Sequence, residues 1–259
     1  MNLKRFAVLT LSGIVLALAG TASATADPLR VGISAEPYPP FTYKSAGGDW
    51  TGFEVELAGL LCERIDEDCE ITPTGWDGII PALRDERIDL IMTSMSITES
   101  RLEVIDFTDP YYYTHGAFVA EAGTELDIPE GLSGMILGVQ GATTHANYAR
   151  QELRDHADRI RTYDDQEDAN RDLLAGRIDV VLADELPMGE FVKRDEASGF
   201  DIVALAPQHS AFGEGIGVGL RKGDGDLRER LNGAIAEVIE DGSCSELSQK
   251  YFERDICGA

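Results

Sequence analysis

Two similar apolar runs end in residues that can bind a small polar molecule. Arg87 to Ser94 and Arg177 to Asp184 each begin with Arg-Ile-Asp, continue with apolar residues and finish on a small or polar residue. The carboxyl ends of strands in α/β sheets carry ligand groups, so Ser94 and Asp184 are candidate binding residues. The repetition predicts two similar α/β halves with a cleft between them.

A guanidinium follows the first of these runs. Thr93 to Arg101 leaves a predicted buried strand and enters a predicted helix, with Thr98 as its N-cap. Backbone N–H groups at such a turn and an arginine form a good carboxylate receptor, because arginine can bond two oxygens in one plane. Arg101 taken alone is typical of a helix surface, but the repeat favours a binding role. In the second half, Gln140 to Thr144 predicts another turn before a helix.

Two aromatic residues stand in loops at the edge of the expected cleft. Tyr38 lies in Tyr-Pro-Pro-Phe after the first predicted strand, and Trp76 precedes a helix. They are either core aromatics or cleft walls, and as walls they would enclose an aliphatic or planar side chain.

Motifs of catalysis are missing from the sequence. It has no Gly-x-Ser-x-Gly, no phosphate-binding loop and no His-Glu-x-x-His. The histidines are scattered without metal-ligand spacing, and we expect surface or structural positions for His115, His145, His156 and His209. Glycines at every second position from Gly213 to Gly219 indicate close packing or a flexible crossing rather than a dinucleotide loop. We therefore expect no metal, no cofactor and no catalytic residue.

The amino terminus predicts export. A basic start is followed by an apolar run from Ala7 to Ala19, which is short for a membrane span. We expect residues 1–26 to be a cleavable signal peptide, and no cysteine follows the run as a lipid acceptor. The four cysteines are typical of an oxidising compartment. Three pairings are possible; we expect the local pairs Cys62–Cys69 and Cys244–Cys257, with free buried cysteines as the alternative.

The charge of the chain argues against nucleic acid as a partner. The formal net charge is -25, and loss of Lys4 and Arg5 with the signal peptide makes it -27. Phosphate backbones need a basic surface.

Periodicity predicts two α/β cycles. The first contains strands at 30–34, 70–72 and 88–92 and helices at 52–65 and after Asp77, which we expect to cap the second helix. The second contains strands at 136–139 and 178–183 and helices at 146–153 and 166–175. A strand at 215–220, a helix at 226–239 and a tail ending in Tyr251-Phe252 return to the first lobe. We predict lobe 1 at 27–114 plus 207–259 and lobe 2 at 115–206, joined by short crossings that act as hinges.

The assembled motifs resemble those of bacterial periplasmic solute-binding proteins of family 3. These serve ABC transporters for polar amino acids, and the likeness is greatest to the lysine/arginine/ornithine and histidine binders. Six or more motifs occur in order over the whole mature chain, among them Tyr38-Pro-Pro-Phe41, Gly52-Phe-Glu-Val-Glu-Leu57, Trp76-Asp-Gly-Ile-Ile-Pro81, Ser94 to Arg101, Phe107 to Tyr112 and Gln140 to Thr144. The resemblance implies an α/β fold of the type II periplasmic binding proteins, with two lobes, a ligand cleft and crossing hinge strands.

The resemblance also implies roles for single residues. Arg101, with the backbone at Ser96 and Thr143, would hold the α-carboxylate of an amino acid. Asp184, with Ser94 and Thr93, would hold the α-ammonium group, and Tyr38 and Trp76 would flank the side chain. Cys62 and Cys69 match a disulfide of the basic-amino-acid binders, whereas Cys244 with Cys257 is an addition.

One loop departs from the family pattern. The segment between Gly32 and Tyr38 is one residue longer than in the basic-amino-acid binders, where an aspartate in that loop meets the cationic side chain. Glu36 or Ser34 is placed to take that role, and Glu54 is a second candidate acid.

The sequence thus predicts a non-enzymatic, monomeric capture protein of the periplasm. It would bind a polar, preferentially basic L-amino acid and deliver it to a membrane permease. The alternatives are a binder of neutral or acidic amino acids, an enzyme resembling cyclohexadienyl dehydratases, and a sensor domain.

Overall fold

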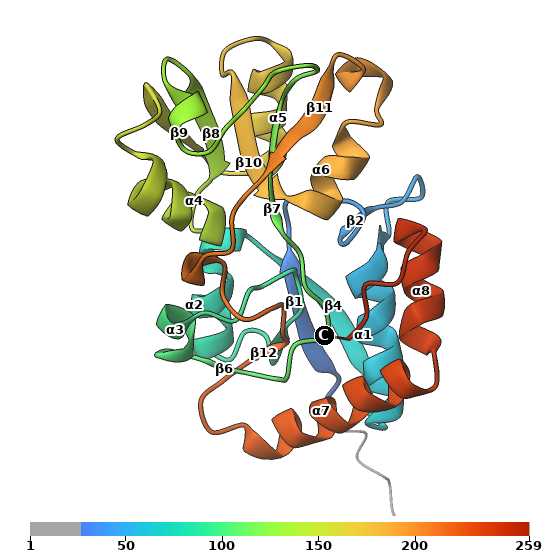
Figure 1. The fold of residues 1–259 in the computed structure, drawn as a ribbon. Coiled ribbons are helices and arrows are strands. Elements are labelled where there is room, and N and C mark those ends of the chain that lie inside the picture. The colour runs from blue at the N-terminus through green and yellow to red at the C-terminus, as the bar shows by residue number, and fades with distance from the viewer. Residues whose placement is uncertain (1–26, 259) are drawn as a thin grey trace, which may run out of the picture.

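Two separate five-stranded sheets organise the chain (Figure 1). The computed structural model describes residues 27–258, so the expected signal peptide lies outside the described residues. Among these residues, no helix is long and apolar enough to cross a membrane.

The first sheet has the order β4-β1-β5-β12-β6. Its strands are β1 (Leu29–Ser34), β4 (Cys69–Thr74), β5 (Leu90–Ile91), β6 (Asp106–Phe107) and β12 (Gly219–Leu220). β1 runs parallel to β4 and β5, and β12 runs antiparallel to β5 and β6. A small hairpin of β2 (Tyr43–Lys44) and β3 (Trp50–Thr51) lies beside it.

The second sheet has the order β11-β7-β10-β8-β9. Its strands are β7 (Gly116–Glu121), β8 (Ile136–Gln140), β9 (Arg159–Tyr163), β10 (Val180–Asp184) and β11 (Phe200–Leu205). β7 is antiparallel to both β10 and β11, whereas β8 is parallel to β10 and β9. β7 was not predicted from the sequence, and neither were β9 and β11. The segment of β7 contains Gly116, Ala117 and Ala120, residue types that are depleted in strands, so it is a weak strand signal.

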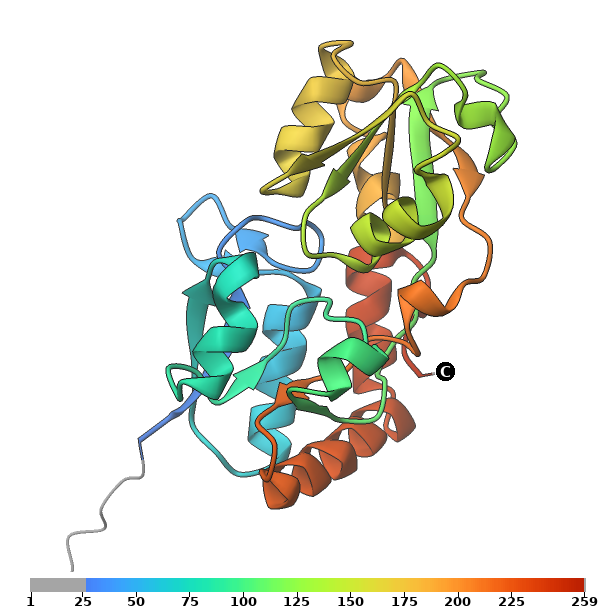
Figure 2. The ribbon, with the colours of Figure 1, turned by 90° about the vertical axis from the view of Figure 1, so that its left-hand side faces the viewer.

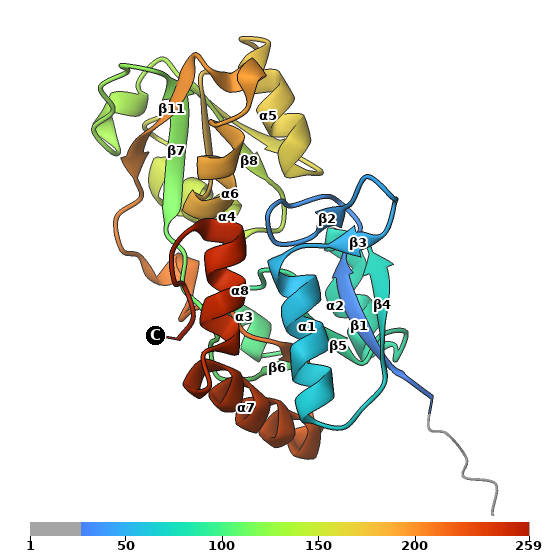
Figure 3. The ribbon, with the colours of Figure 1, turned by 90° about the vertical axis from the view of Figure 1, so that its right-hand side faces the viewer.

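Helices cover both sheets. Around the first sheet lie α1 (Phe53–Arg64), α2 (Ile79–Arg84), α3 (Glu99–Leu102), α7 (Gly225–Glu240) and α8 (Ser243–Phe252), and with the second sheet lie α4 (Thr144–Tyr148), α5 (Gln166–Leu174) and α6 (Glu185–Phe191). Figure 3 shows α1, α7 and α8 side by side. The return of the C-terminal helices to the first sheet therefore agrees with the expectation from sequence, although α6 and α8 were not predicted as helices.

Local chemistry explains several helix ends. The Thr98 hydroxyl caps α3 by accepting a hydrogen bond from the Arg101 N–H at 3.3 Å, as the sequence predicted. The expected cap Asp77 is wrong, because a 3₁₀ turn at Trp76–Gly78 precedes α2 and Gly78 takes the N-cap position. The predicted helix at 146–153 is α4 followed by a π-helical turn at Ala149–Leu153.

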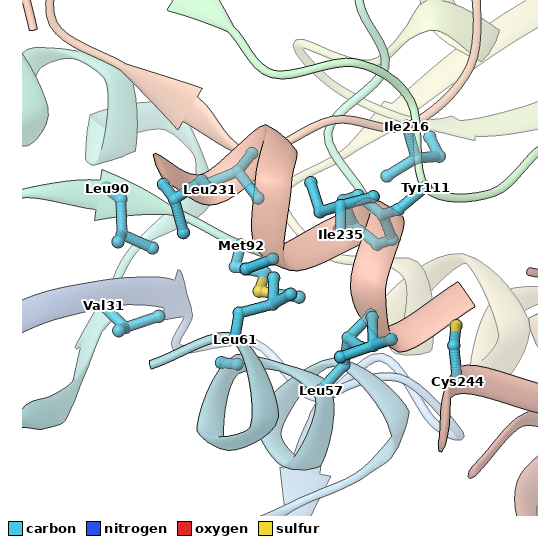
Figure 4. Packing of buried hydrophobic residues seen from close by; sticks show 14 of the residues in the cluster. Val31, Leu57, Leu61, Leu90, Met92, Tyr111, Ile216, Leu231, Ile235 and Cys244 are labelled. Carbon is cyan, nitrogen blue, oxygen red and sulfur yellow. The ribbon is translucent and has the colours of Figure 1, made fainter. Parts of the chain in front are cut away.

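The largest core lies under the first sheet. Leu57 and Leu61 of α1 pack against Leu231 and Ile235 of α7, and all four are fully or almost fully buried (Figure 4). Both predicted local disulfides are present, Cys62–Cys69 and Cys244–Cys257. The first ties the end of α1 to β4, and the second ties α8 to the C-terminal tail.

The chain crosses between the sheets twice, after β6 and after β11 (Figure 2). On the return crossing, Gly213 has φ +82, and a Cβ there would lie 2.1 Å from the Ile97 carbonyl oxygen. The alternate glycines therefore serve close packing, and only Gly219–Leu220 of the predicted strand at 215–220 is paired as a strand. The lobe limits at 115 and 206 remain a prediction. The division of the strands between the two sheets is compatible with them.

Candidate functional site

A cavity lies between the two sheets, and the space between its walls, including the part that is open to solvent, is about 590 Å³. All nine residues that the sequence nominated as ligand contacts line it. They are Glu36, Tyr38, Trp76, Thr93, Ser94, Ser96, Arg101, Thr143 and Asp184. The structure also places Ser34, Pro37, Gln140, Thr144, His145, Gln166 and Leu182 in the wall. The cavity thus collects the residues, while their contact with a ligand remains a prediction.

Arg101 is held on the first-sheet side of the cavity. Its Nη1 donates to the Ser96 carbonyl oxygen at 2.8 Å, and its Nη2 donates to the Ala142 carbonyl oxygen at 3.4 Å. Its guanidinium carbon lies 5.5 Å from the centre of the Trp76 ring, a cation–π contact. No carboxylate among residues 27–258 lies within ion-pair distance of Arg101. Burial lowers the pKa of Arg101 to about 10, with the charge of Asp184 opposing this, so the guanidinium is protonated at neutral pH and can accept an anion.

Asp184 enters the cavity from the opposite side. It is the last residue of β10 and the N-cap of α6, but its side chain makes no cap hydrogen bond. The Tyr38 hydroxyl donates to Asp184 Oδ2 at 2.5 Å. Burial, reinforced by the charge of Asp184, raises the pKa of Tyr38 well above its usual value, so this tyrosine is a neutral donor. Asp184 therefore offers its remaining acceptor positions to a cation in the cavity.

His145 was expected at the surface or in a structural position, and the surface prediction is wrong for it. It is 6% exposed, and its Nε2 lies 3.6 Å from Asp184 Oδ1 with no hydrogen-bond partner among the described residues. Burial lowers the pKa of His145; the charge of Asp184 opposes this shift and that of Arg101 adds to it. The sequence contained a signal for this position. His145 lies in the first turn of the helix that Thr143 caps, and residues of that turn lie close to the end of the preceding strand.

Glu36 occupies the extended loop after β1. Its Oε2 accepts hydrogen bonds from the Ser34 hydroxyl at 2.6 Å and from the Trp76 N–H at 3.1 Å. Its Oε1 accepts none from residues 27–258. Of the two candidates in this loop, Glu36 therefore presents a free carboxylate oxygen, while the Ser34 hydroxyl is committed to Glu36.

Glu54 lies behind the cavity wall and does not line it. It is fully buried and accepts hydrogen bonds from the N–H and the hydroxyl of Ser94, at 2.8 and 3.0 Å. Glu54 is therefore a neighbour of the cavity wall rather than a direct contact of a molecule within it.

The other histidines lie away from the cavity. His115 pairs with Glu185 at 3.5 Å and His209 with Glu152 at 3.4 Å. Among residues 27–258, no cluster of histidine, cysteine, aspartate or glutamate is placed to hold a metal ion.

Two α/β sheets with a polar cavity between them define a two-lobed binding protein. A family model described as bacterial extracellular solute-binding proteins, family 3, matches residues 29–254. The chain belongs to this family.

Known proteins of similar sequence and structure support this membership. The chain is 37% identical to an L-arginine-binding protein of Pseudomonas aeruginosa, over 99% of this chain and 100% of that protein. It is 36% identical to the histidine-binding periplasmic protein of Escherichia coli, over 97% of this chain and 98% of that protein. A solved structure of an ancestral arginine-binding protein bound to arginine superimposes with a TM-score of 0.81 at 32% identity, covering 88% of this chain and 99% of that one.

Proposed function

We propose that this protein is the substrate-binding component of an ABC importer. It captures a polar L-amino acid, preferentially a basic one, in the periplasm and delivers it to a membrane permease. The family membership and its relatives, an L-arginine-binding protein and a histidine-binding periplasmic protein, support this proposal. The observation that carries it is the presence of Arg101 and Asp184 in one cavity, where Arg101 comes from α3 beside the first sheet and Asp184 from the end of β10 in the second.

The two charges match the two poles of an amino acid. Arg101 has no carboxylate partner of its own among the described residues, and a ligand α-carboxylate supplies one, with the backbone at Ser96 and Thr143 beside it. Asp184, with Thr93 and Ser94, holds the α-ammonium group. A buried charge left unpaired costs about 3 to 5 kcal/mol, so each pole strongly favours its partner.

The free oxygen of Glu36 favours a basic side chain. Arg101, Asp184 and Glu36 together leave an excess of one negative charge in the cavity, which a lysine or arginine ligand neutralises. Tyr38 and Trp76 provide aromatic surface for the aliphatic part of such a side chain. Lysine, arginine, ornithine and histidine are therefore the preferred candidates.

Capture by closure of the two halves follows from the same residues. Tyr38 bonds Asp184 and Arg101 bonds the Ala142 carbonyl oxygen, so both contacts join the halves across the cavity. A ligand that bridges Arg101 and Asp184 binds the closed arrangement better than an open one, which shifts the population toward closure. The two crossings act as the hinges.

Residues 1–26 act in this proposal as a cleaved signal peptide, and the mature protein works as a monomer without a cofactor. We infer no catalysis, since the cavity groups are those that bind a zwitterion. The alternative of a cyclohexadienyl dehydratase is tested directly by incubation with prephenate and arogenate, whose turnover would contradict a pure binding role.

The experiment that tests the proposal is a thermal-shift screen against the common amino acids, followed by titration calorimetry. Arg101→Ala is expected to weaken binding at least about a hundredfold, since an energy of 1.4 kcal/mol corresponds to a factor of ten. Arg84→Ala, at the exposed end of α2, is the matched control and retains affinity. Unchanged affinity of Arg101→Ala overturns the assignment of the carboxylate site.

A further inference from the structure

A buried carboxylate supports the cavity from behind. Glu54 stands in the first turn of α1, is fully buried and does not line the cavity. Its Oε1 accepts hydrogen bonds from the Ser94 N–H and from the Tyr111 hydroxyl, and its Oε2 accepts one from the Ser94 hydroxyl. An ionised carboxylate can accept all three at once, because it has two oxygens and no proton of its own.

The residue that Glu54 holds has an unusual backbone. Ser94 has φ +52, a left-handed conformation that favours glycine. Its N–H can only donate, and Glu54 supplies the acceptor. Such conformations persist where surrounding contacts enforce them, and they are common at ligand sites. Glu54 thus fixes the direction in which Ser94 faces the cavity.

The same glutamate joins the loop that carries Tyr38. The Glu54 N–H donates to the Phe41 carbonyl oxygen at 3.1 Å, and the Phe53 N–H donates to the Pro40 carbonyl oxygen at 2.9 Å. Gly52 permits this contact, since its φ is +123 and a Cβ there would lie 2.2 Å from the Phe41 oxygen. One residue therefore connects the turn of Ser94 with the loop whose tyrosine bonds Asp184.

We propose that Glu54 is a positioning residue that aligns Ser94 for the α-ammonium group of the ligand and places a second buried negative charge beneath that group. The inference rests on the proposed function, because it requires an amino acid in the cavity. It assigns Glu54 a role through Ser94, in place of contact with the ligand side chain.

The protonation of Glu54 gives this role a measurable signature. Burial raises the pKa of Glu54 to about 7; hydrogen bonds from Tyr111 and Ser94 oppose this shift, and the charge of Asp184 adds to it. A bound ammonium group favours the ionised form. Affinity should therefore rise with pH through about 7 and be about tenfold weaker at pH 6 than at pH 8, with proton release on binding.

The tyrosines around Glu54 and Asp184 do not change charge in this interval. Burial raises the pKa values of Tyr38, Tyr111 and Tyr112 well above their usual value, so all three stay neutral. Burial lowers the pKa of His145, and Arg101 stays charged with a pKa of about 10. We assign the pH dependence around pH 7 to Glu54, and the Glu54→Gln variant separates it from a contribution of His145.

Titration calorimetry with the amino acid found in the screen tests this at pH 6, 7 and 8, in buffers of different ionisation enthalpy. The wild type should lose about tenfold in affinity toward pH 6 and release protons. Glu54→Gln should bind more weakly at pH 8, with a flat pH profile and no proton release. Glu63→Gln, an exposed position of the same helix, is the control and should behave as the wild type.

Tyr111→Phe tests the same inference if Glu54→Gln does not fold. It removes one hydrogen bond that lowers the pKa of Glu54, so the midpoint of the affinity profile should move to higher pH. A purely structural role of Glu54 predicts no such movement. Wild-type binding together with an unchanged profile in either variant overturns this inference alone, whereas a wild type that binds no amino acid overturns the proposed function as well.

Discussion

The Tyr38 hydroxyl donates a hydrogen bond of 2.5 Å to Asp184, and the two residues stand 146 positions apart in the chain. Tyr38 belongs to the loop after β1 of the first sheet, and Asp184 ends β10 of the second. Their bond joins the two halves at the cavity, and it orients the carboxylate that we assign to the ligand α-ammonium group.

Tyr38→Phe keeps the aromatic wall and removes this bond. A hydrogen bond to a charged group contributes about 1.5 to 3 kcal/mol, so we expect affinity to fall by at least about tenfold. Titration calorimetry measures the effect. Tyr113→Phe, at a tyrosine that is 45% exposed, is the control and should leave the affinity unchanged. Equal affinity of Tyr38→Phe and wild type would show that the bond does not support binding.

Glu36→Gln should change ligand preference. The amide keeps an oxygen for the Ser34 hydroxyl and the Trp76 N–H but removes the negative charge that faces the cavity. We expect the ratio of affinities for arginine and glutamine to fall by about tenfold or more, since a charge-assisted hydrogen bond is lost only with the basic ligand. Competition titrations with both amino acids measure the ratio. If the ratio does not change, a residue other than Glu36 recognises the ligand side chain.

Acid should weaken the ion pair between Arg30, at the start of β1, and Asp89. Asp89 accepts three hydrogen bonds from the Arg30 main chain and guanidinium, each 2.9 Å long, and also meets Arg221. Burial alone would raise the pKa of Asp89, but the bonds and charges of Arg30 and Arg221 outweigh it and lower this pKa. Because the pKa is depressed in the folded protein, this stabilisation is complete above the unfolded pKa of about 3.9 and is lost as the pH falls through the folded value.

The matching experiment compares the urea unfolding of Asp89→Asn and wild type at two pH values. At pH 7 the free energy of unfolding of the variant should be about 1 to 3 kcal/mol lower than that of the wild type. At pH 3 the two free energies of unfolding should lie closer together. Asp85→Asn, at an exposed position after α2, is the control. If Asp89→Asn lowers the free energy of unfolding by the same amount at both pH values, the charge of Asp89 does not contribute to stability.

The C-terminal disulfide should stabilise the tail beside the first crossing. Cys244 and Cys257 are 13 residues apart, and Cys257 pairs with Tyr112 in an isolated β-bridge. Closing a loop of this size stabilises the fold by roughly 3 kcal/mol on the entropic model. The double variant Cys244→Ala/Cys257→Ala should unfold at correspondingly lower urea concentration. The pair Cys62–Cys69 closes a shorter loop, so its removal should cost slightly less.

The sequence by itself determined the features that depend on neighbours along the chain. The cap Thr98, the end of a strand at Asp184 and the local cysteine pairs are all governed by short-range geometry. Family motifs then nominated the residues that line the cavity. Even so, β7 was not predicted, because Gly116, Ala117 and Ala120 are residue types that are depleted in strands, whereas the valines of β10 mark a strand clearly.

Only the tertiary structure decided which residues from distant parts of the chain contact each other. His145 lies beside Asp184 because α4 and the end of β10 meet in one half, and Glu36 faces the cavity because the Trp76 N–H and the Ser34 hydroxyl hold its carboxylate there. Glu54 reaches Ser94 and Tyr111, residues 40 and 57 positions away, and only the packing of α1 brings them together. Burial and the charges of distant residues set the pKa values of Glu54 and Arg101, and these depend on distances in space that sequence spacing does not fix.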